Sequence, residues 1–259
     1  MVQSSKTYVY VRKFVKGAFI VMKWVRFVIV IICFYSNVQT IASAEMIKRN
    51  QVEPTGQVVW DVATQKKVIA LTFDDGPSPV YTPQVLAVLE QYGANATFFQ
   101  IGSRMELYPE VVQQVVEAGH ELGNHSMTHP YENKVGFKQM RHEIIRAEQI
   151  IQKYQPNHPK LFRPPGGYLD NDLLQEAKSQ GYKVVLWSYH QELKDWSQPG
   201  AQVIANHVIR HARNGDILLL HDGGGDRRQT IQALKIFLPA LKQKGYQFVS
   251  VSELLSNKE

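Results

Sequence analysis

The sequence has a single cysteine, Cys33, among its 259 residues. The part of the chain after residue 44 therefore contains no cysteine, which excludes disulfide bonds and thiol chemistry there. A domain of about 200 residues without disulfide bonds must be held together by its hydrophobic core, and it is long enough to form one. Any metal site in this part is restricted to histidine, aspartate, glutamate and water as ligands.

An excess of one charge sign is also absent once the N-terminal segment is set aside. The first 44 residues hold six of the 29 Lys and Arg residues and none of the 23 Asp and Glu residues, so 23 basic residues remain against 23 acidic ones. The basic character of the chain belongs to its N-terminal segment. The remainder gives no support for a nucleic-acid surface, and we expect no nucleic-acid partner.

The chain also lacks a hydrophobic run long enough to span a bilayer. The apolar run Phe27–Tyr35 is shorter than the roughly 20 residues of a membrane span. It follows a basic region and precedes Ala42-Ser43-Ala44, which is the order of a secretory signal peptide. We expect residues 1–44 to be a signal peptide and the protein to be secreted or associated with the cell envelope. An uncleaved membrane anchor is the alternative, and it would then be the only membrane contact.

Residues 45–66 are polar and aperiodic, which predicts a linker, and residues 67–255 form the predicted catalytic domain. In that domain, apolar runs typical of strands alternate about seven times with helical patterns. The expected strands lie near residues 67–73, 96–100, 120–124, 161–163, 184–187, 217–220 and 248–249. Such alternation indicates parallel strands with helical crossovers, in either a closed barrel or an open doubly wound sheet.

Polar residues follow the C-terminal end of nearly every expected strand. The strand ends of a barrel converge on one rim, where the loops after the strands build active sites, whereas only loops beside a switch point meet in an open sheet. The distribution favours a distorted (β/α) barrel of about seven parallel strands. These polar residues are Asp74, Asp75, His125, His129, Arg163, Asp195 and His221.

Two adjacent carboxylates, Asp74 and Asp75, end the first strand of the domain just before a Gly-Pro turn. Neighbouring residues on a strand point to opposite faces, so we expect the two aspartates to have different functions. Two acids at the end of a buried strand also repel each other unless a cation or a hydrogen-bond donor lies between them. A solvated turn is the alternative, because Asp-Asp-Gly is common in turns.

Two histidines four residues apart, His125 and His129, share one side of a single turn, which Pro130 prevents from continuing as a helix. Together with Asp75 they would form a three-ligand site with open positions for water and substrate. Such a site suits zinc or another divalent first-row ion; cobalt, manganese and nickel are the alternatives to zinc. The pair alone is also compatible with an ordinary surface turn.

These residues, taken in order, resemble the five motifs of the polysaccharide deacetylase family, also called the NodB-homology domain or carbohydrate esterase family four. The resemblance covers roughly residues 66–255. The motifs are Thr72-Phe73-Asp74-Asp75-Gly76-Pro77, His125-Ser126-Met127-Thr128-His129, Arg163-Pro164-Pro165-Gly166, Asp195-Trp196 and Leu219-Leu220-His221. The resemblance implies a metal-dependent enzyme that hydrolyses N-acetyl groups of N-acetylglucosamine-type polysaccharides. An N-acetylated glycan polymer, with peptidoglycan the nearest substrate, is the implied partner of a monomeric enzyme.

The resemblance also assigns roles. Asp74 would be the general base, oriented by Arg163, and His221 would be the general acid, tuned by Asp195. Asp75, His125 and His129 would be the metal ligands. The implied substrate-binding residues are Gly166 through its backbone N–H, Trp196 and Leu219 around the acetyl methyl group, and Tyr168 as a replacement for the sugar-stacking aromatic residue that many relatives carry where Gly166 stands.

Two other readings of the chain remain open. An O-acetyl esterase acting on a xylan-like glycan would need the same residues. A glycan-binding pseudoenzyme would not need a base, an acid and three metal ligands together, which counts against it. His190 is an additional histidine near these motifs, with no role assigned by the sequence.

Overall fold

The protein is described by a computed structural model that covers residues 47–130 and 137–258. The predicted signal peptide or anchor, residues 1–44, lies outside the described residues. Across the described ranges, none of the helices is long and apolar enough to cross a membrane.

The described part of the chain is built around one sheet whose paired strands all run parallel. The strand order is β1-β6-β5-β4-β3-β2-β7, and β8 also pairs with β2. The strands are β1 (Val58–Val59), β2 (Val68–Asp74), β3 (Thr97–Gln100), β4 (Glu121–Asn124), β5 (Leu161–Phe162), β6 (Lys183–Val185), β7 (Ile217–His221) and β8 (Gln247–Val249).

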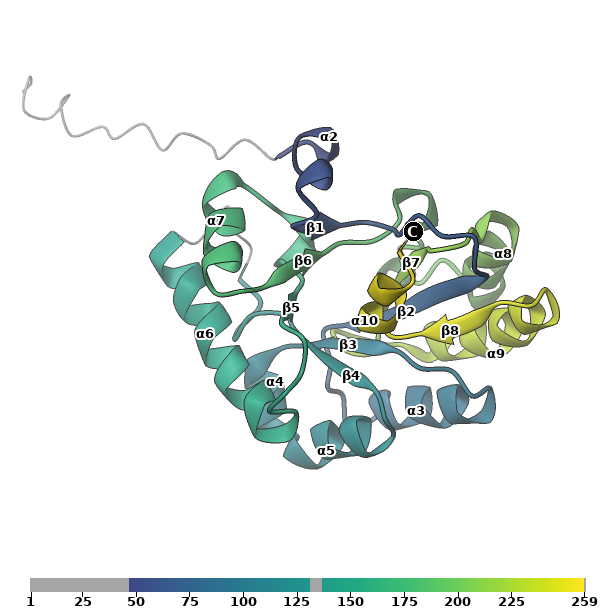
Figure 1. The fold of residues 1–259 in the computed structure, drawn as a ribbon. Coiled ribbons are helices and arrows are strands. Elements are labelled where there is room, and N and C mark those ends of the chain that lie inside the picture. The colour runs from purple at the N-terminus through teal and green to yellow at the C-terminus, as the bar shows by residue number, and fades with distance from the viewer. Residues whose placement is uncertain (1–46, 131–136, 259) are drawn as a thin grey trace, which may run out of the picture. The chain divides into compact units, whose positions relative to one another are not determined.

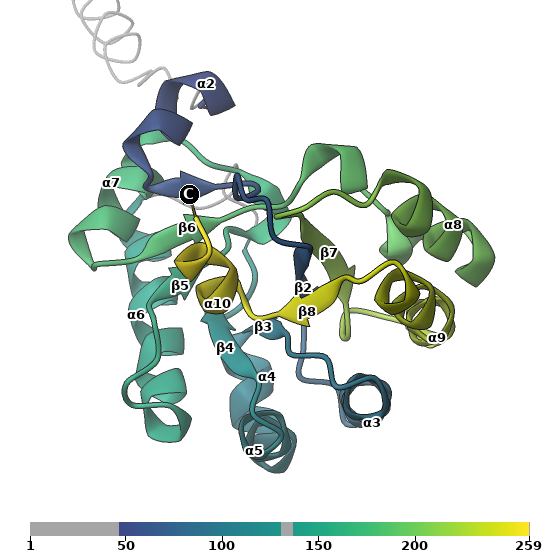
Figure 2. The ribbon, with the colours of Figure 1, turned by 45° about the vertical axis from the view of Figure 1, so that its right-hand side comes forward.

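The helices are α2 (Arg49–Val52), α3 (Thr82–Gln91), α4 (Gly102–Leu107), α5 (Pro109–Glu117), α6 (Phe137–Tyr154), α7 (Asn171–Ser179), α8 (Ala201–His211), α9 (Arg228–Gln243) and α10 (Val251–Ser256). Most of them lie around the outside of the curved sheet (Figures 1 and 2). The exception is α10, whose Val251 and Leu254 pack in the core inside the barrel with residues of β2. Short 3-10 turns are η1 (Glu53–Thr55), η3 (Pro165–Gly167), η4 (Tyr189–Gln191) and η5 (Asp195–Ser197).

The sheet is a distorted, incompletely closed barrel, as the alternation of strands and helices predicts. Among the described strands, no ladder joins the two edge strands, β1 and β7. An isolated bridge between Asp61 and Asp216 links the segment after β1 to the start of β7. Ser188, which follows β6, also bonds to β7: its backbone N–H donates to Ile217 O (3.0 Å) and its Oγ accepts from Ile217 N (3.1 Å).

Residues 58–62 correct part of the predicted linker. Val58 and Val59 pair with β6, and Trp60 is almost fully buried. Val62 N donates to Gly215 O at 2.9 Å, which ties the segment to the start of β7. The sequence gives no strand pattern here because the strand has only two residues. Its structure is determined by burial against the sheet rather than by a local sequence pattern.

The alternation of side chains along β2 determines which of its residues point into the barrel and which point toward the helices. Ile69, Leu71 and Phe73 face the helices and belong to the outer core. Val68 and Ala70 belong to the core inside the barrel. Because side chains alternate along a strand, Thr72 and then Asp74 continue the inward-facing row. The interior is apolar at the start of β2 and polar at its C-terminal end.

Candidate active site

A cavity of about 590 Å³ opens at the C-terminal ends of the strands. It is lined by ten of the eleven residues that the sequence singles out: Asp74, Asp75, His125, His129, Gly166, Tyr168, Asp195, Trp196, Leu219 and His221. The eleventh, Arg163, lies directly beneath the cavity and is bonded to Asp74. Residues from five separate strand ends thus meet at one place.

Arg163 fixes the carboxylate of Asp74 from below. Its side chain is fully buried and its Nη1 donates to Asp74 Oδ1 and to Thr72 Oγ1, both at 2.7 Å. Its Nε and Nη2 donate to the carbonyls of Val185 and Leu186 at 3.0 and 2.9 Å. The guanidinium is therefore held by β2 and by the end of β6. One Asp74 oxygen is occupied by this charge-assisted bond, and the other faces the cavity.

Asp75 reaches the same cavity as Asp74, which corrects the expectation from strand geometry. Strand β2 ends at Asp74, and Asp75 has a left-handed backbone (φ 68°). The turn, rather than the pleat of the strand, sets the direction of its side chain. The two carboxylates still have different partners, because Asp74 is bonded to Arg163 whereas Asp75 faces His125 and His129.

The loop after β4 presents the two histidines. His125 is buried, and its Nδ1–H donates to Arg163 O at 2.7 Å, which leaves Nε2 to face the carboxylates. Ser126 and His129 both have positive φ (66° and 57°), and Ser126 Oγ accepts from His129 N at 3.0 Å. This tight turn brings the two imidazole rings to 4.9 Å between centroids.

The donor atoms of Asp75, His125 and His129 fit a small divalent ion. Asp75 Oδ1 lies 3.6 Å from His125 Nε2 and 3.3 Å from His129 Nε2. Tetrahedral zinc with bonds of ~2.0–2.1 Å places its ligand atoms about 3.3 Å apart. Asp75 Oδ1 is also buried, and no residue in the described part of the chain donates a hydrogen bond to it. The geometry and the donor set are those of a metal site with open positions.

The electrostatics at these residues favour a cation. Burial by itself would lower the pKa of His125, but the carboxylates of Asp74 and Asp75 outweigh it and raise that pKa. For Asp75, burial would raise the pKa, but His125, together with His221 and His129, holds that pKa well below its usual range. The carboxylates that favour a proton on His125 would equally favour a metal ion in the proton's place.

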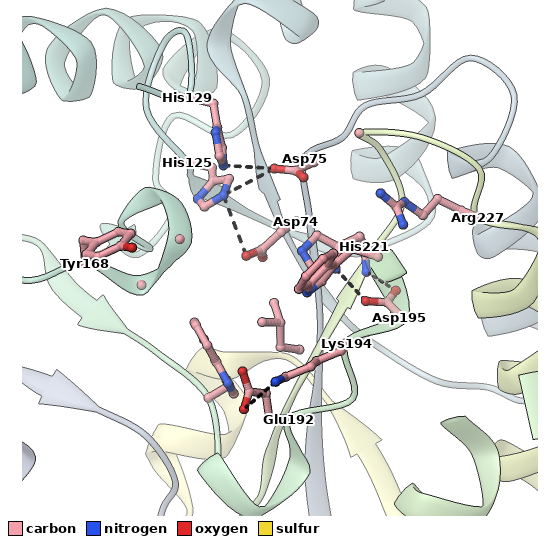
Figure 3. Close-up of a pocket in the computed structure, with 16 residues that line it drawn as sticks. Asp74, Asp75, His125, His129, Tyr168, Glu192, Lys194, Asp195, His221 and Arg227 are labelled. Atoms are coloured by element: carbon pink, nitrogen blue, oxygen red, sulfur yellow. Dashed lines mark hydrogen bonds and ion pairs between the residues drawn. The ribbon is translucent and has the colours of Figure 1, made fainter. Parts of the chain in front are cut away.

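His221 and Asp195 form a second pair on the other side of the cavity (Figure 3). His221 Nδ1 donates to Asp195 Oδ1 at 2.7 Å, and Asp195 Oδ2 accepts from His221 N (2.9 Å) and from Thr230 Oγ1 (2.8 Å). Burial opposes both charges, yet the pairing raises the pKa of His221 and lowers that of Asp195. With Nδ1 engaged, His221 presents Nε2 to the cavity, where it can donate a proton.

The remaining predicted residues form the wall and rim. Tyr168 and Trp196 are 38% and 58% exposed, so their rings are accessible to a polymer passing over the opening. Gly167 packs against Trp187 so closely that a Cβ would lie 2.7 Å from that ring. Trp187 therefore forms a wall that the sequence motifs do not identify.

The loop between β7 and α9 supports Asp75 and was missed by sequence reasoning. Asp222 N donates to Asp74 O at 3.2 Å, and a Cβ on Gly76 would lie 2.5 Å from the Asp222 carboxylate. A Cβ on Gly223 would overlap the Asp75 carbonyl, and one on Gly224 would lie 2.7 Å from Asp75 Oδ2. The run of three glycines after His221 is the signal that such close packing occurs.

His190, whose role the sequence leaves open, is a structural residue. Its Nε2 lies 3.0 Å from Asp216 Oδ1, and Asp216 is buried at the N-terminal end of β7. His190 is not among the residues that line the cavity.

Comparison with known proteins agrees with the motifs and the geometry. The sequence model of the family described as polysaccharide deacetylase matches residues 61–185. The chain is 51% identical over 213 residues to a peptidoglycan-N-acetylglucosamine deacetylase of Bacillus cereus, covering 82% of this chain and all of that protein.

Two solved structures are similar in fold. One is a peptidoglycan N-acetylglucosamine deacetylase in complex with 4-naphthalen-1-yl-N-oxidanyl-benzamide, with a TM-score of 0.76 and 31% identity over 81% of this chain and 99% of that one. The other is a carbohydrate esterase family 4 pseudoenzyme from Bacillus anthracis, with a TM-score of 0.71 and 26% identity over 78% of this chain and 70% of that one.

Proposed function

The chain belongs to the polysaccharide deacetylase family, and from this premise we propose that it removes N-acetyl groups from the N-acetylglucosamine residues of peptidoglycan. It is a hydrolase of N-acetyl amide bonds in polysaccharides, and it releases acetate and a free amine. The peptidoglycan assignment is supported by the relative that is 51% identical over its whole length.

The main support for this function is that a carboxylate suited to accept a proton and an imidazole suited to donate one line the same cavity, each held by a different partner. Asp74 is held by Arg163 and faces the cavity with its second oxygen, so it is suited to accept the proton of the attacking water. His221 is held by Asp195 and is suited to donate a proton to the leaving nitrogen. An amine leaves poorly unless it is protonated, so amide hydrolysis needs both groups.

We propose that Asp75, His125 and His129 hold zinc. A divalent ion at this position would lower the pKa of water and polarise the amide carbonyl. The imidazole of His125 is oriented for this by its bond to the Arg163 carbonyl. Two nitrogens and one carboxylate oxygen at 3.3 and 3.6 Å separation support zinc over larger ions, with cobalt, manganese and nickel as alternatives.

The substrate would lie across the opening. Leu219 lines the cavity, and with Trp196 it would receive the acetyl methyl group, while the backbone N–H of Gly166 would donate to the developing oxyanion. Tyr168, which lies across the cavity from His221 and Asp195, would stack on a sugar ring (Figure 3). We also propose that the enzyme is active as a monomer, because the proposed base, acid and metal ligands belong to a single copy of the chain and the proposed reaction requires no residue from a second copy.

The rival readings differ in a measurable way. A pseudoenzyme would bind glycan without turnover, and the likeness to one such structure means that the fold alone does not distinguish it from an enzyme. The presence of the proposed base, acid and metal ligands together supports an enzyme. An O-acetyl esterase would prefer acetylated xylan. The test is acetate release from peptidoglycan, chitin oligomers, poly-N-acetylglucosamine and acetylated xylan, with and without a chelator. Chelator-sensitive release from the N-acetylated glycans is expected, and release from xylan alone would contradict the proposal.

We also propose that the protein is secreted or held in the cell envelope, on the basis of the signal-peptide order in residues 1–44. The secreted protein should then begin at or near Glu45, as N-terminal sequencing would establish. Recovery of the full-length chain in membranes alone would instead identify the segment as an anchor.

A further inference from the structure

Arg227 is a buried cation in the active-site cavity that the proposed reaction does not use. It is 3% exposed, it is one of the lining residues, and its side chain points toward the region of Asp75 and His221 (Figure 3). Its Nε donates to Gly223 O at 2.6 Å. Its Nη1 is buried and has no hydrogen-bond partner among the described residues.

No carboxylate in the described ranges neutralises this guanidinium, because none of the ion pairs found there includes Arg227. The adjacent acid, Asp226, is paired with Arg228 at 2.5 Å. The other acid of this loop, Asp222, accepts from Thr82 Oγ1 and packs against Gly76.

Burying an unpaired charge is costly, and proteins normally pair such a group or provide it with a ligand. The position of Arg227 adds to the positive potential, since it is the N-cap residue of the 16-residue helix α9. A buried guanidinium without an acidic partner in the described ranges therefore lines the same cavity as the groups proposed to carry out hydrolysis.

We propose that Arg227 binds a carboxylate in the active-site cavity. The proposal rests on the proposed function, which supplies two sources of that chemistry: the acetate that the reaction releases, and an acidic substituent on the glycan. A planar guanidinium suits a carboxylate because it can donate two parallel hydrogen bonds. The burial of Arg227 favours a small carboxylate over a bulky one.

The test is calorimetric titration of the metal-loaded protein with sodium acetate and with acetamide, a neutral molecule of nearly the same shape. Arg227→Gln should weaken acetate binding roughly tenfold or more and leave acetamide binding unchanged, since a hydrogen bond to a charged group is lost only for the anion. Arg227→Lys keeps the charge but not the planar, two-pronged donor group, so its acetate affinity should lie between those of the wild-type protein and Arg227→Gln. Arg228→Gln is the matched control: it removes the same charge from the exposed neighbouring position and should leave acetate affinity within about twofold.

A second measurement distinguishes the sources of the carboxylate. In Arg227→Gln, a raised inhibition constant for acetate with an unchanged kcat/KM on chitin oligomers would assign the site to the product. A fall in kcat/KM confined to glycans that carry carboxylates would assign it to the substrate. The proposal would be overturned if Arg227→Gln bound acetate as tightly as the wild-type protein does. It would also be overturned if the variant lost metal and lost affinity for acetate and acetamide equally. In either case, Arg227 would only support the structure of the glycine loop. Absence of turnover in the wild-type protein would refute the proposed function, whereas the titration would still decide the role of Arg227.

Discussion

Asp195→Asn isolates the electrostatic part of the proposed acid catalysis. Asp195 is buried and accepts three hydrogen bonds, two of them from His221. Its charge raises the pKa of His221. Asparagine has almost the same shape and can still accept from His221 N and Thr230, so the variant removes the charge with little change in packing.

The size of the effect follows from the bond that is lost. A hydrogen bond between charged partners contributes roughly 1.5–3 kcal/mol, and ~1.4 kcal/mol corresponds to a tenfold change in a protonation equilibrium. His221 must be protonated to act as an acid, so activity falls as the pH rises through its pKa. Without the Asp195 charge, this fall should move to lower pH by about 1 to 2 pH units.

The assay is the pH dependence of kcat/KM for acetate release from a chitin oligomer and for hydrolysis of an aryl acetate. At pH values above the pKa of His221 in both proteins, the amide reaction of Asp195→Asn should be about 10- to 100-fold slower, whereas the ester reaction should change little because its leaving group needs no proton. Thr230→Val, which removes one donor but keeps the Asp195 charge, should shift the profile less.

An unchanged high-pH limb in Asp195→Asn would refute this reasoning, because His221 would then titrate independently of Asp195. Equal losses on the amide and the ester would also contradict it, since a group that protonates the leaving atom should matter only for the amide.

Three further variants test the supporting structure. Arg163→Met leaves a buried carboxylate unpaired and should destabilise the protein by about 3–5 kcal/mol in urea unfolding; a cost near zero would mean that water replaces the guanidinium. Gly224→Ala should weaken metal binding in a chelator competition because its Cβ presses on Asp75, whereas Gly225→Ala, also at positive φ, should not. Tyr182→Phe removes a hydroxyl bonded to Glu148 and Asn124 and should cost about 1–3 kcal/mol with unchanged metal content.

The alternation of apolar runs was sufficient to predict the parallel barrel and the convergence of polar residues on one rim. Each strand ends where its apolar run stops, so Asp74, Arg163 and His221 could be placed at strand ends without knowing the loops between them. The two-residue strand β1 and the six-residue helix α4 are too short to give a periodic signal, and they are stabilised by tertiary packing instead.

The details of the site depend on backbone conformations that periodicity does not predict. Strand pleating alone would turn Asp75 away from Asp74, but its left-handed backbone returns the carboxylate to the cavity. The donor from Thr230 and the unpaired guanidinium of Arg227 come from a helix end distant in sequence. Such contacts are set by the packing of α9 on the barrel, so they become visible only in three dimensions.

The central claim is that the two adjacent aspartates have separate functions, one in metal binding and one in proton transfer. The most direct measurement is metal content after dialysis, with acetate release from a chitin oligomer measured in parallel, for Asp74→Asn and Asp75→Asn. Asp75→Asn should lose metal, because an amide is a poorer ligand than a carboxylate. Asp74→Asn should keep the metal and lose turnover, because an amide cannot accept the proton of water. Loss of metal in both variants, or retained turnover in Asp74→Asn, would contradict the account.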